Sequence, residues 1–165
     1  MDAIIVAAGM GRRLKEFTNN RPKCMLEING ISIFKRQTDI LLKNGISDIN
    51  VVVGYRKEWF TDKRFIYFEN LEYEKNNILH SLFYADKAMD QGFIFTYCDI
   101  IYDDTIVKQM LNSGSDIAIA VDPDWMGYYE GRTEHPIEEA ELVFSENGDN
   151  VSKICKEADY KNSIG

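Results

Sequence analysis

The chain of 165 residues is long enough to bury a substantial core without a disulfide or a metal to stabilise it. Its 45% hydrophobic and 28% charged residues exclude a disordered tail, a collagen-like repeat and a coiled coil. The net charge of −8 argues against a general nucleic-acid-binding protein. The longest apolar run, residues 3–8, is too short to cross a membrane, and three cysteines without a CxxC pair indicate a reduced, cytoplasmic protein.

The charge is distributed unevenly along the chain. Residues 1–57 carry ten basic and five acidic side chains, a balance of +5, whereas residues 58–165 carry nine and twenty-two, a balance of −13. A local anion-binding site in the first third is one interpretation of this asymmetry, and chance unevenness of solvated charges is the other.

The predicted elements alternate between strands and helices. In chain order they are a buried strand at 2–7, a long loop at 8–24, a helix from Ser32 to about Lys43, a buried strand at 49–53, a short helix around 56–62, a strand at 65–68, a helix capped by Asn76 or Asn77, a buried strand at 93–98, a helix at 104–111 and a strand at 117–121. Gln37 is the polar exception on the apolar face of the first helix.

Strands that alternate with helices of this length predict right-handed crossovers and a Rossmann-like three-layer α/β/α fold with a mostly parallel central sheet. The pattern changes after residue 121. A polar and aromatic loop occupies 122–139, and two apolar runs, 142–144 and 151–155, flank Asn147-Gly148. Asn-Gly between apolar runs predicts a C-terminal β-hairpin.

The loop after the first strand reads Ala7-Ala8-Gly9-Met10-Gly11-Arg12-Arg13-Leu14. Leu14 stands where a dinucleotide-binding motif requires a third glycine, and the Gly-Lys-Ser/Thr of a P-loop is absent. The two glycines can present bare backbone N–H groups to phosphate oxygens, and two arginines follow at once. Pro22-Lys23 adds an ammonium group ten residues later. These features together predict an anion-binding loop, whereas Gly-x-Gly alone is more typical of a tight turn between a strand and a helix.

This loop, with Thr18 and Pro22-Lys23-Cys24-Met25-Leu26, resembles the signature of the sugar nucleotidyltransferase superfamily. Within that superfamily it is most similar to the phosphocholine and 2-aminoethylphosphonate cytidylyltransferase-like branch. Arg12 departs from the pattern by replacing a small hydroxyl residue, and Glu16 departs from it by replacing a proline.

The resemblance implies a fold of the nucleotide-diphospho-sugar transferase type and a Mg²⁺-dependent reaction. In this reaction a nucleoside triphosphate, here CTP, is joined to a small phosphorylated or phosphonate acceptor such as phosphocholine or 2-aminoethylphosphonate, and pyrophosphate is released. Two alternatives remain open: a sugar-1-phosphate nucleotidyltransferase, and a nucleotide-binding module without catalysis.

The same resemblance implies roles for individual residues. Those that would bind the nucleotide are Ala8, Gly9, Gly11, Arg12, Arg13, Asn77 and Ser81. Arg13, on the leaving pyrophosphate, and Lys23, between the α-phosphate and the acceptor, are the implied catalytic residues. Asp99, directly after the strand at 93–98, is the implied Mg²⁺ ligand, with strand-end capping as its alternative. For Asn77 the alternative is a helix cap.

Aromatic and charged residues crowd the loop at 122–139. Rings and acids there can form a cage for an amine or a quaternary ammonium group, and an arginine can bind the acceptor's phosphate. The acceptor-binding residues expected on this basis are Trp125, Tyr128, Tyr129 and Arg132. The alternative is a loop that folds its rings onto the sheet.

Members of the superfamily usually continue past this length and supply a second acidic metal ligand. We therefore expect residues 1–165 to form a single nucleotidyltransferase domain that lacks the C-terminal part usual in the family. The expected partners are small molecules, with no nucleic acid and no membrane, and the sequence leaves open whether the chain forms a homodimer.

Overall fold

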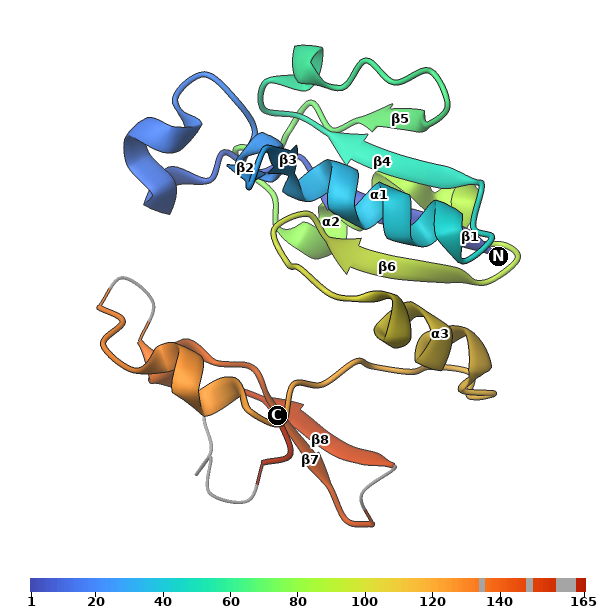
Figure 1. The fold of residues 1–165 in the computed structure, drawn as a ribbon, viewed down its shortest axis with the longest axis vertical. Coiled ribbons are helices and arrows are strands. Elements are labelled where there is room, and N and C mark those ends of the chain that lie inside the picture. Colours follow the sequence, from blue (N-terminus) through green and yellow to red (C-terminus); the bar gives the residue numbers. More distant parts are fainter. Residues whose placement is uncertain (134–135, 148–149, 157–162) are drawn as a thin grey trace. The chain divides into compact units, whose positions relative to one another are not determined.

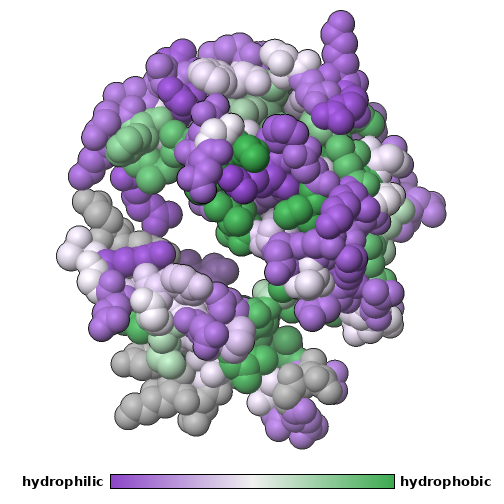
Figure 2. All heavy atoms as spheres, viewed as in Figure 1, coloured by the Kyte–Doolittle hydropathy of each residue, from purple (hydrophilic) through white to green (hydrophobic). Residues whose placement is uncertain are grey.

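The computed structural model describes residues 1–133, 136–147, 150–156 and 163–165. The chain divides into two compact units, Met1–Gly114 and Ser115–Gly165. In these described ranges no helix is long and apolar enough to cross a membrane. Hydrophilic side chains cover most of the face drawn in Figure 2, with apolar patches between them.

A parallel four-stranded sheet forms the centre of the first unit (Figure 1). Its spatial order is β5-β4-β1-β6, with β1 at Asp2–Ala7, β4 at Ile49–Val53, β5 at Ile66–Glu69 and β6 at Phe93–Tyr97. Ile5 pairs with Val51 of β4 on one side and with Thr96 of β6 on the other. The chain thus builds outward from β1 through β4 and β5 and returns to the other side with β6. The strand order therefore reverses between β1 and β6, where ligands of open α/β sheets bind.

Helices cover both faces of this sheet. The α-helices are α1 at Ile33–Lys43, α2 at Ile78–Leu82 and α3 at Asp104–Asn112. Short 3-10 helices occupy Arg12–Thr18, Lys23–Met25, Lys57–Trp59 and Phe83–Ala88, and a small hairpin joins β2 (Glu27–Ile28) to β3 (Ile31–Ser32). In Figure 1, α1 crosses the front of the sheet.

The side chains of β1 alternate between two hydrophobic cores. Ile5 belongs to the core that contains Leu41 of α1 and Val107 of α3. Ile4 belongs to the core that contains Ala85 and is bordered by α2. Because a strand points successive side chains to opposite faces, this division places the sheet between two helical layers. The predicted three-layer α/β/α arrangement is confirmed.

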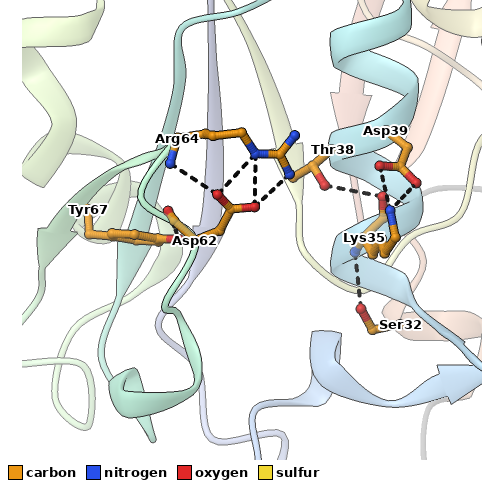
Figure 3. A network of polar contacts seen from close by, with 7 residues as sticks. All are labelled: Ser32, Lys35, Thr38, Asp39, Asp62, Arg64 and Tyr67. Atoms are coloured by element: carbon orange, nitrogen blue, oxygen red, sulfur yellow. Dashed lines mark hydrogen bonds and ion pairs between the residues drawn. The ribbon is translucent and has the colours of Figure 1, made fainter.

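Local signals placed α1 where it was predicted. The Ser32 hydroxyl accepts a hydrogen bond from the Lys35 backbone N–H, 3.2 Å away, as a helix N-cap does. Lys35 also pairs with Asp39 one turn later (Figure 3). The chain leaves the helix through Gly45 at φ +81°, a backbone angle that glycine adopts without strain.

The second unit contains the predicted hairpin. Strand β7 (Leu142–Ser145) pairs antiparallel with β8 (Val151–Cys155), which confirms that prediction, although residues 148–149 of its turn lie outside the described residues. Trp125, Ala140 and Leu142 form a small core beside it. Two 3-10 helices, Trp125–Tyr129 and Ile137–Glu139, precede β7.

The strand predicted at 117–121 is wrong. This segment has no regular secondary structure and no strand partner among the described residues. Ile117 is 85% exposed and Ile119 is 45% exposed. A run of apolar residues is compatible with a β-strand. A strand forms, however, only where a neighbouring strand pairs with its backbone N–H and C=O groups. In this fold the parallel sheet ends at β6.

Candidate functional site

Lys23 and Asp99 form an ion pair beside β1 and β6, where the strand order of the sheet reverses. Their Nζ and Oδ2 atoms are 2.5 Å apart, although 76 positions separate them in the sequence. Lys23 lies in the loop that follows β1, and Asp99 follows β6. Since β1 and β6 are parallel neighbours, both loops leave the sheet at the same edge. The side chains are 24% and 43% exposed, so both remain accessible to a ligand.

Two buried cysteines anchor this ion pair. Cys24 follows Lys23, Cys98 precedes Asp99, and both side chains belong to the core on the α1 side of the sheet. A hydrogen bond with the Cys98 side chain, together with burial, raises the pKa of the Cys24 thiol well above its ordinary value. Cys24 therefore stays a neutral thiol that anchors the chain beside Lys23, because a nucleophilic cysteine needs a lowered pKa.

Gly11 determines how the glycine-rich loop turns. Its φ of +62° is left-handed, and a Cβ atom there would lie 3.2 Å from both Lys23 Cβ and Thr18 Cγ2. The Thr18 hydroxyl donates to the Gly11 carbonyl oxygen at 3.0 Å, which closes the loop on itself. Gly11 thus lets the loop pass close to Lys23. A Cβ atom at Gly9, in contrast, would meet no described atom within 4 Å.

The other predicted residues of this loop differ in exposure. Arg12 and Arg13 are exposed, and neither forms an ion pair with a described residue. Ala8 is 2% exposed, and its carbonyl oxygen accepts a hydrogen bond from the Tyr55 N–H at 3.0 Å. The two guanidinium groups are therefore available for an anion, whereas Ala8 contributes backbone and packing.

The segment after β4 braces the same loop, a contact that the sequence did not predict. The Tyr55 hydroxyl lies 2.9 Å from the Thr18 carbonyl oxygen and 2.8 Å from that of Asn19. Trp59 Nε1 donates to the Asn20 carbonyl oxygen at 2.9 Å. The segment after β4 thus contacts three consecutive carbonyl oxygens of the glycine-rich loop. These contacts give Tyr55 a role in bracing the loop.

Asn77 and Ser81 take part in local hydrogen bonds. Asn77 caps α2 by accepting from the His80 backbone N–H at 3.0 Å. Ser81 is 5% exposed, and its hydroxyl accepts from Asn70 Nδ2 at 2.9 Å. Asn70, which is fully buried, also donates to Asn76 at 3.0 Å. Asn70 was missed by sequence reasoning, although a polar residue directly after β5 was the available signal.

Gln37 links α1 to the segment that carries Asp99. Its Nε2 atom donates to the carbonyl oxygens of Tyr97, at 2.8 Å, and Ile100, at 2.7 Å. The side chain is 1% exposed. The polar exception on the apolar helix face therefore contacts the end of β6.

The aromatic residues of the second unit lie around Tyr129. The ring of Trp125 packs edge-on against that of Tyr129, with centroids 5.6 Å apart, and the Arg132 guanidinium lies 5.1 Å from the Tyr129 centroid. Tyr128 is 62% exposed. An open groove of about 560 Å³ is lined by Met126, Gly127, Tyr129, Glu130, Arg132, Pro136, Ile137 and Glu138. Tyr129 and Arg132 thus line a concave surface, whereas Trp125 supports it from the core.

Asp99 is the carboxylate that fits a metal in the first unit. Among the described residues no group of three or more His, Cys, Asp or Glu side chains could hold a metal ion. Mg²⁺, however, is typically bound by one or two carboxylates together with substrate phosphates and water. The partly exposed Asp99 carboxylate beside an anion-binding loop therefore suits an ion that enters with a triphosphate.

Known proteins with similar sequences include several cytidylyltransferases. The CTP:phosphoglutamine cytidylyltransferase of Campylobacter jejuni is 35% identical over 159 residues, which cover 90% of this chain and 63% of the relative. The 2-aminoethylphosphonate cytidylyltransferase of Lancefieldella rimae is 33% identical over 114 residues, covering 66% and 46%. The choline-phosphate cytidylyltransferase of Streptococcus pneumoniae is 34% identical over 98 residues, covering 57% and 43%. The chain thus spans between 43% and 63% of the length of these relatives.

Solved structures support the same grouping. The CTP:phosphocholine cytidylyltransferase of Streptococcus pneumoniae matches with a TM-score of 0.56 and 32% identity, over 59% of this chain and 44% of that one. The inositol-1-phosphate CTP transferase of T. maritima matches with a TM-score of 0.70 over 98% of this chain and 66% of that one, and its 22% identity shows the fold alone.

These similarities confirm the predicted nucleotide-diphospho-sugar transferase type of fold and the resemblance to the cytidylyltransferase branch. Residues 3–146 match the family described as the MobA-like NTP transferase domain. Since that match includes the glycine-rich loop, Lys23 and Asp99, the chain belongs to the MobA-like NTP transferase family.

Proposed function

We propose that this chain carries the nucleotide-binding site of a Mg²⁺-dependent cytidylyltransferase of the cytoplasm. The enzyme transfers the cytidylyl group of CTP to a small phosphorylated or phosphonate acceptor and releases pyrophosphate. The observation that carries the proposal is the Lys23–Asp99 ion pair beside the glycine-rich loop, at the reversal of strand order. Similarity to three cytidylyltransferases supports CTP as the nucleotide.

The triphosphate binds to the loop from Gly9 to Arg13. The backbone at Gly9 is open to a close approach, and the guanidinium groups of Arg12 and Arg13 are exposed. A guanidinium group binds phosphate oxygens through two parallel hydrogen bonds. Arg13 contacts the β- and γ-phosphates and stabilises the charge that the leaving pyrophosphate gains.

Entry of the nucleotide separates Lys23 from Asp99. The two side chains neutralise each other in the free protein, where 2.5 Å separates their charged atoms. In the complex the Asp99 carboxylate would hold Mg²⁺, and the Lys23 ammonium would turn to the α-phosphate. The chemistry that bound Mg²⁺ supplies is neutralisation of phosphate charge and polarisation of the phosphoryl oxygens.

An anionic acceptor needs no strong general base. An oxygen of its phosphate or phosphonate forms a bond to the α-phosphorus, and the bond from that phosphorus to the oxygen bridging to the β-phosphate breaks. The electron pair of the broken bond leaves with pyrophosphate. Catalysis then consists of alignment and charge stabilisation, which Lys23 and Arg13 provide.

The acceptor binds in the second unit. Arg132, which lines the groove of about 560 Å³, can hold the acceptor's phosphate or phosphonate. Tyr129 and Glu130 line the same groove and can contact an amine or a quaternary ammonium group through a ring face and a carboxylate. The exposed ring of Tyr128 and the supporting ring of Trp125 complete the proposed acceptor-binding set.

Pyrophosphate release tests the proposal. The chain is incubated with Mg²⁺ and CTP, and phosphocholine, 2-aminoethylphosphonate, phosphoglutamine and glucose 1-phosphate are offered separately, with UTP and ATP in parallel. We expect release from CTP with at least one of the first three acceptors. Release only with UTP and glucose 1-phosphate would identify a sugar-1-phosphate nucleotidyltransferase. Stabilisation by CTP without release from any acceptor would identify a module without catalysis.

Variants of the ion pair test the residue roles. Lys23→Ala should lower turnover by about two to three orders of magnitude, because a charge aimed at the transition state is removed. Asp99→Asn should abolish the Mg²⁺-dependent activity, and an unchanged Mg²⁺ titration would remove Asp99 from the proposed metal site. Lys35→Ala is the matched control, because it breaks an exposed ion pair with Asp39 on α1. Near-normal turnover of Lys23→Ala would exclude the proposed role of Lys23.

A further inference from the structure

Gln37 is a buried polar residue on a helix face that otherwise supplies the core. The same face of α1 buries Phe34 and Leu41, and Gln37 is 1% exposed. An apolar side chain at this position would continue the hydrophobic core. Packing alone therefore does not explain why a buried amide group occupies position 37.

The contacts of Gln37 are directed at one segment. Both hydrogen bonds run from Nε2 to backbone carbonyl oxygens, those of Tyr97 and Ile100. Carbonyl oxygens only accept hydrogen bonds, so the amide nitrogen rather than the amide oxygen must face them. The two carbonyls flank Cys98 and Asp99. One side chain of α1 therefore holds the chain on both sides of the carboxylate that pairs with Lys23.

The other half of the amide argues against a purely stabilising role. Gln37 Oε1 is buried and has no hydrogen-bond partner among the described residues. A buried polar atom without a partner costs free energy. The protein therefore tolerates a loss of folding free energy at Gln37, the residue that hydrogen-bonds to the turn carrying Asp99.

We propose that Gln37 is a positioning residue that fixes the Asp99 carboxylate opposite Lys23. Asp99 lies in a turn directly after β6, and its side chain is 43% exposed, so packing around the carboxylate itself is incomplete. The Gln37 amide limits the movement of the backbone on which that carboxylate is mounted. The metal-binding part of this inference rests on the proposed function, whereas the restraint on residues 97–100 does not.

Two measurements on Gln37→Met test the inference. The thioether keeps the length of the side chain but donates no hydrogen bond. Hydrogen exchange of the backbone amides at 98–101 should become about tenfold faster. The dissociation constant of Mn²⁺, titrated in the presence of CTP without acceptor, should rise about tenfold, the usual effect of losing a group that orients a metal ligand.

Thr38→Val is the matched control. Thr38 is the next residue of α1 and is 3% exposed. Among the described residues its hydroxyl bonds only within its own helix, to the Lys35 carbonyl oxygen at 3.1 Å. This variant also removes a buried polar group from α1, but it should change neither Mn²⁺ binding nor exchange at 98–101. Asp99→Asn reports independently whether Asp99 holds the ion.

Each outcome decides a separate point. Unchanged exchange at 98–101 in Gln37→Met would overturn the inference. Faster exchange with unchanged Mn²⁺ binding, while Asp99→Asn weakens that binding, would reduce Gln37 to a structural residue and would also overturn it. If Mn²⁺ binding is absent, or is unaffected by Asp99→Asn, the proposed function fails at Asp99. The exchange measurement then decides alone whether Gln37 restrains the segment.

Discussion

The substitution Gly11→Ala tests how closely the glycine-rich loop must pass Lys23. Gly11 has φ +62° and ψ 33°, a left-handed conformation. The new methyl group would lie 3.2 Å from Lys23 Cβ and from Thr18 Cγ2, which is closer than ordinary van der Waals contact. The variant should therefore be strained in its backbone and should displace Lys23.

A second glycine allows the two effects to be separated. Gly45 also has a left-handed φ, +81°, but a Cβ atom there would meet no described atom within 4 Å. An L-residue in this conformation costs about 1–2 kcal/mol, so Gly45→Ala should lower the free energy of unfolding by that amount. Gly11→Ala should lose the same amount and more, because Lys23 and Thr18 must also move.

Only Gly11→Ala should affect catalysis. A shift of a positioned catalytic group lowers the rate by about ten- to a hundredfold, which is about 1.4–2.7 kcal/mol of transition-state stabilisation. Urea denaturation followed by circular dichroism measures the loss of stability, and pyrophosphate release measures kcat/KM. If Gly11→Ala loses no more stability than Gly45→Ala and keeps the wild-type kcat/KM, the argument from its close contacts is refuted.

Two further predictions concern the contacts of Tyr55 with the glycine-rich loop and the exposed ion pair between Asp62 and Arg64. Tyr55→Phe removes the hydroxyl that contacts the Thr18 and Asn19 carbonyl oxygens, so it should lower the free energy of unfolding by about 1 kcal/mol, as measured by urea denaturation. It should also raise KM for CTP, as measured from initial rates. An unchanged KM would show that the Tyr55 contacts do not contribute to nucleotide binding. Hydrogen bonds from Arg64 lower the pKa of Asp62 from 3.8 to about 2 (Figure 3). A lowered pKa in the folded state means that this pair stabilises the fold above pH 3.8 and loses its contribution as the pH falls toward 2. Arg64→Ala should return the pKa of Asp62 toward 3.8, as measured by NMR titration, and an unmoved pKa would contradict the assigned cause.

Local signals in the sequence determined most of the secondary structure. The β-branched runs of β1 and β4, the cap at Ser32 and the stop at Gly45 each act within a few residues, and the structure confirms them. The strand predicted at 117–121 is wrong because the apolar run that predicted it is also only a local signal. Its local pattern fits a strand, but the strand partner that it needs is a property of the whole fold.

The candidate site divides in the same way. Its motif residues, Gly11, Lys23 and Asp99, could be named from the sequence because spacing and resemblance mark them. That Lys23 lies 2.5 Å from Asp99, and that Gln37 reaches across 60 positions to the Tyr97 carbonyl, depends on β6 pairing with β1. The sequence by itself therefore determined the local elements and the chemical groups. Only the tertiary structure decided which groups meet, because strand order is set by packing over the whole chain rather than by neighbouring residues.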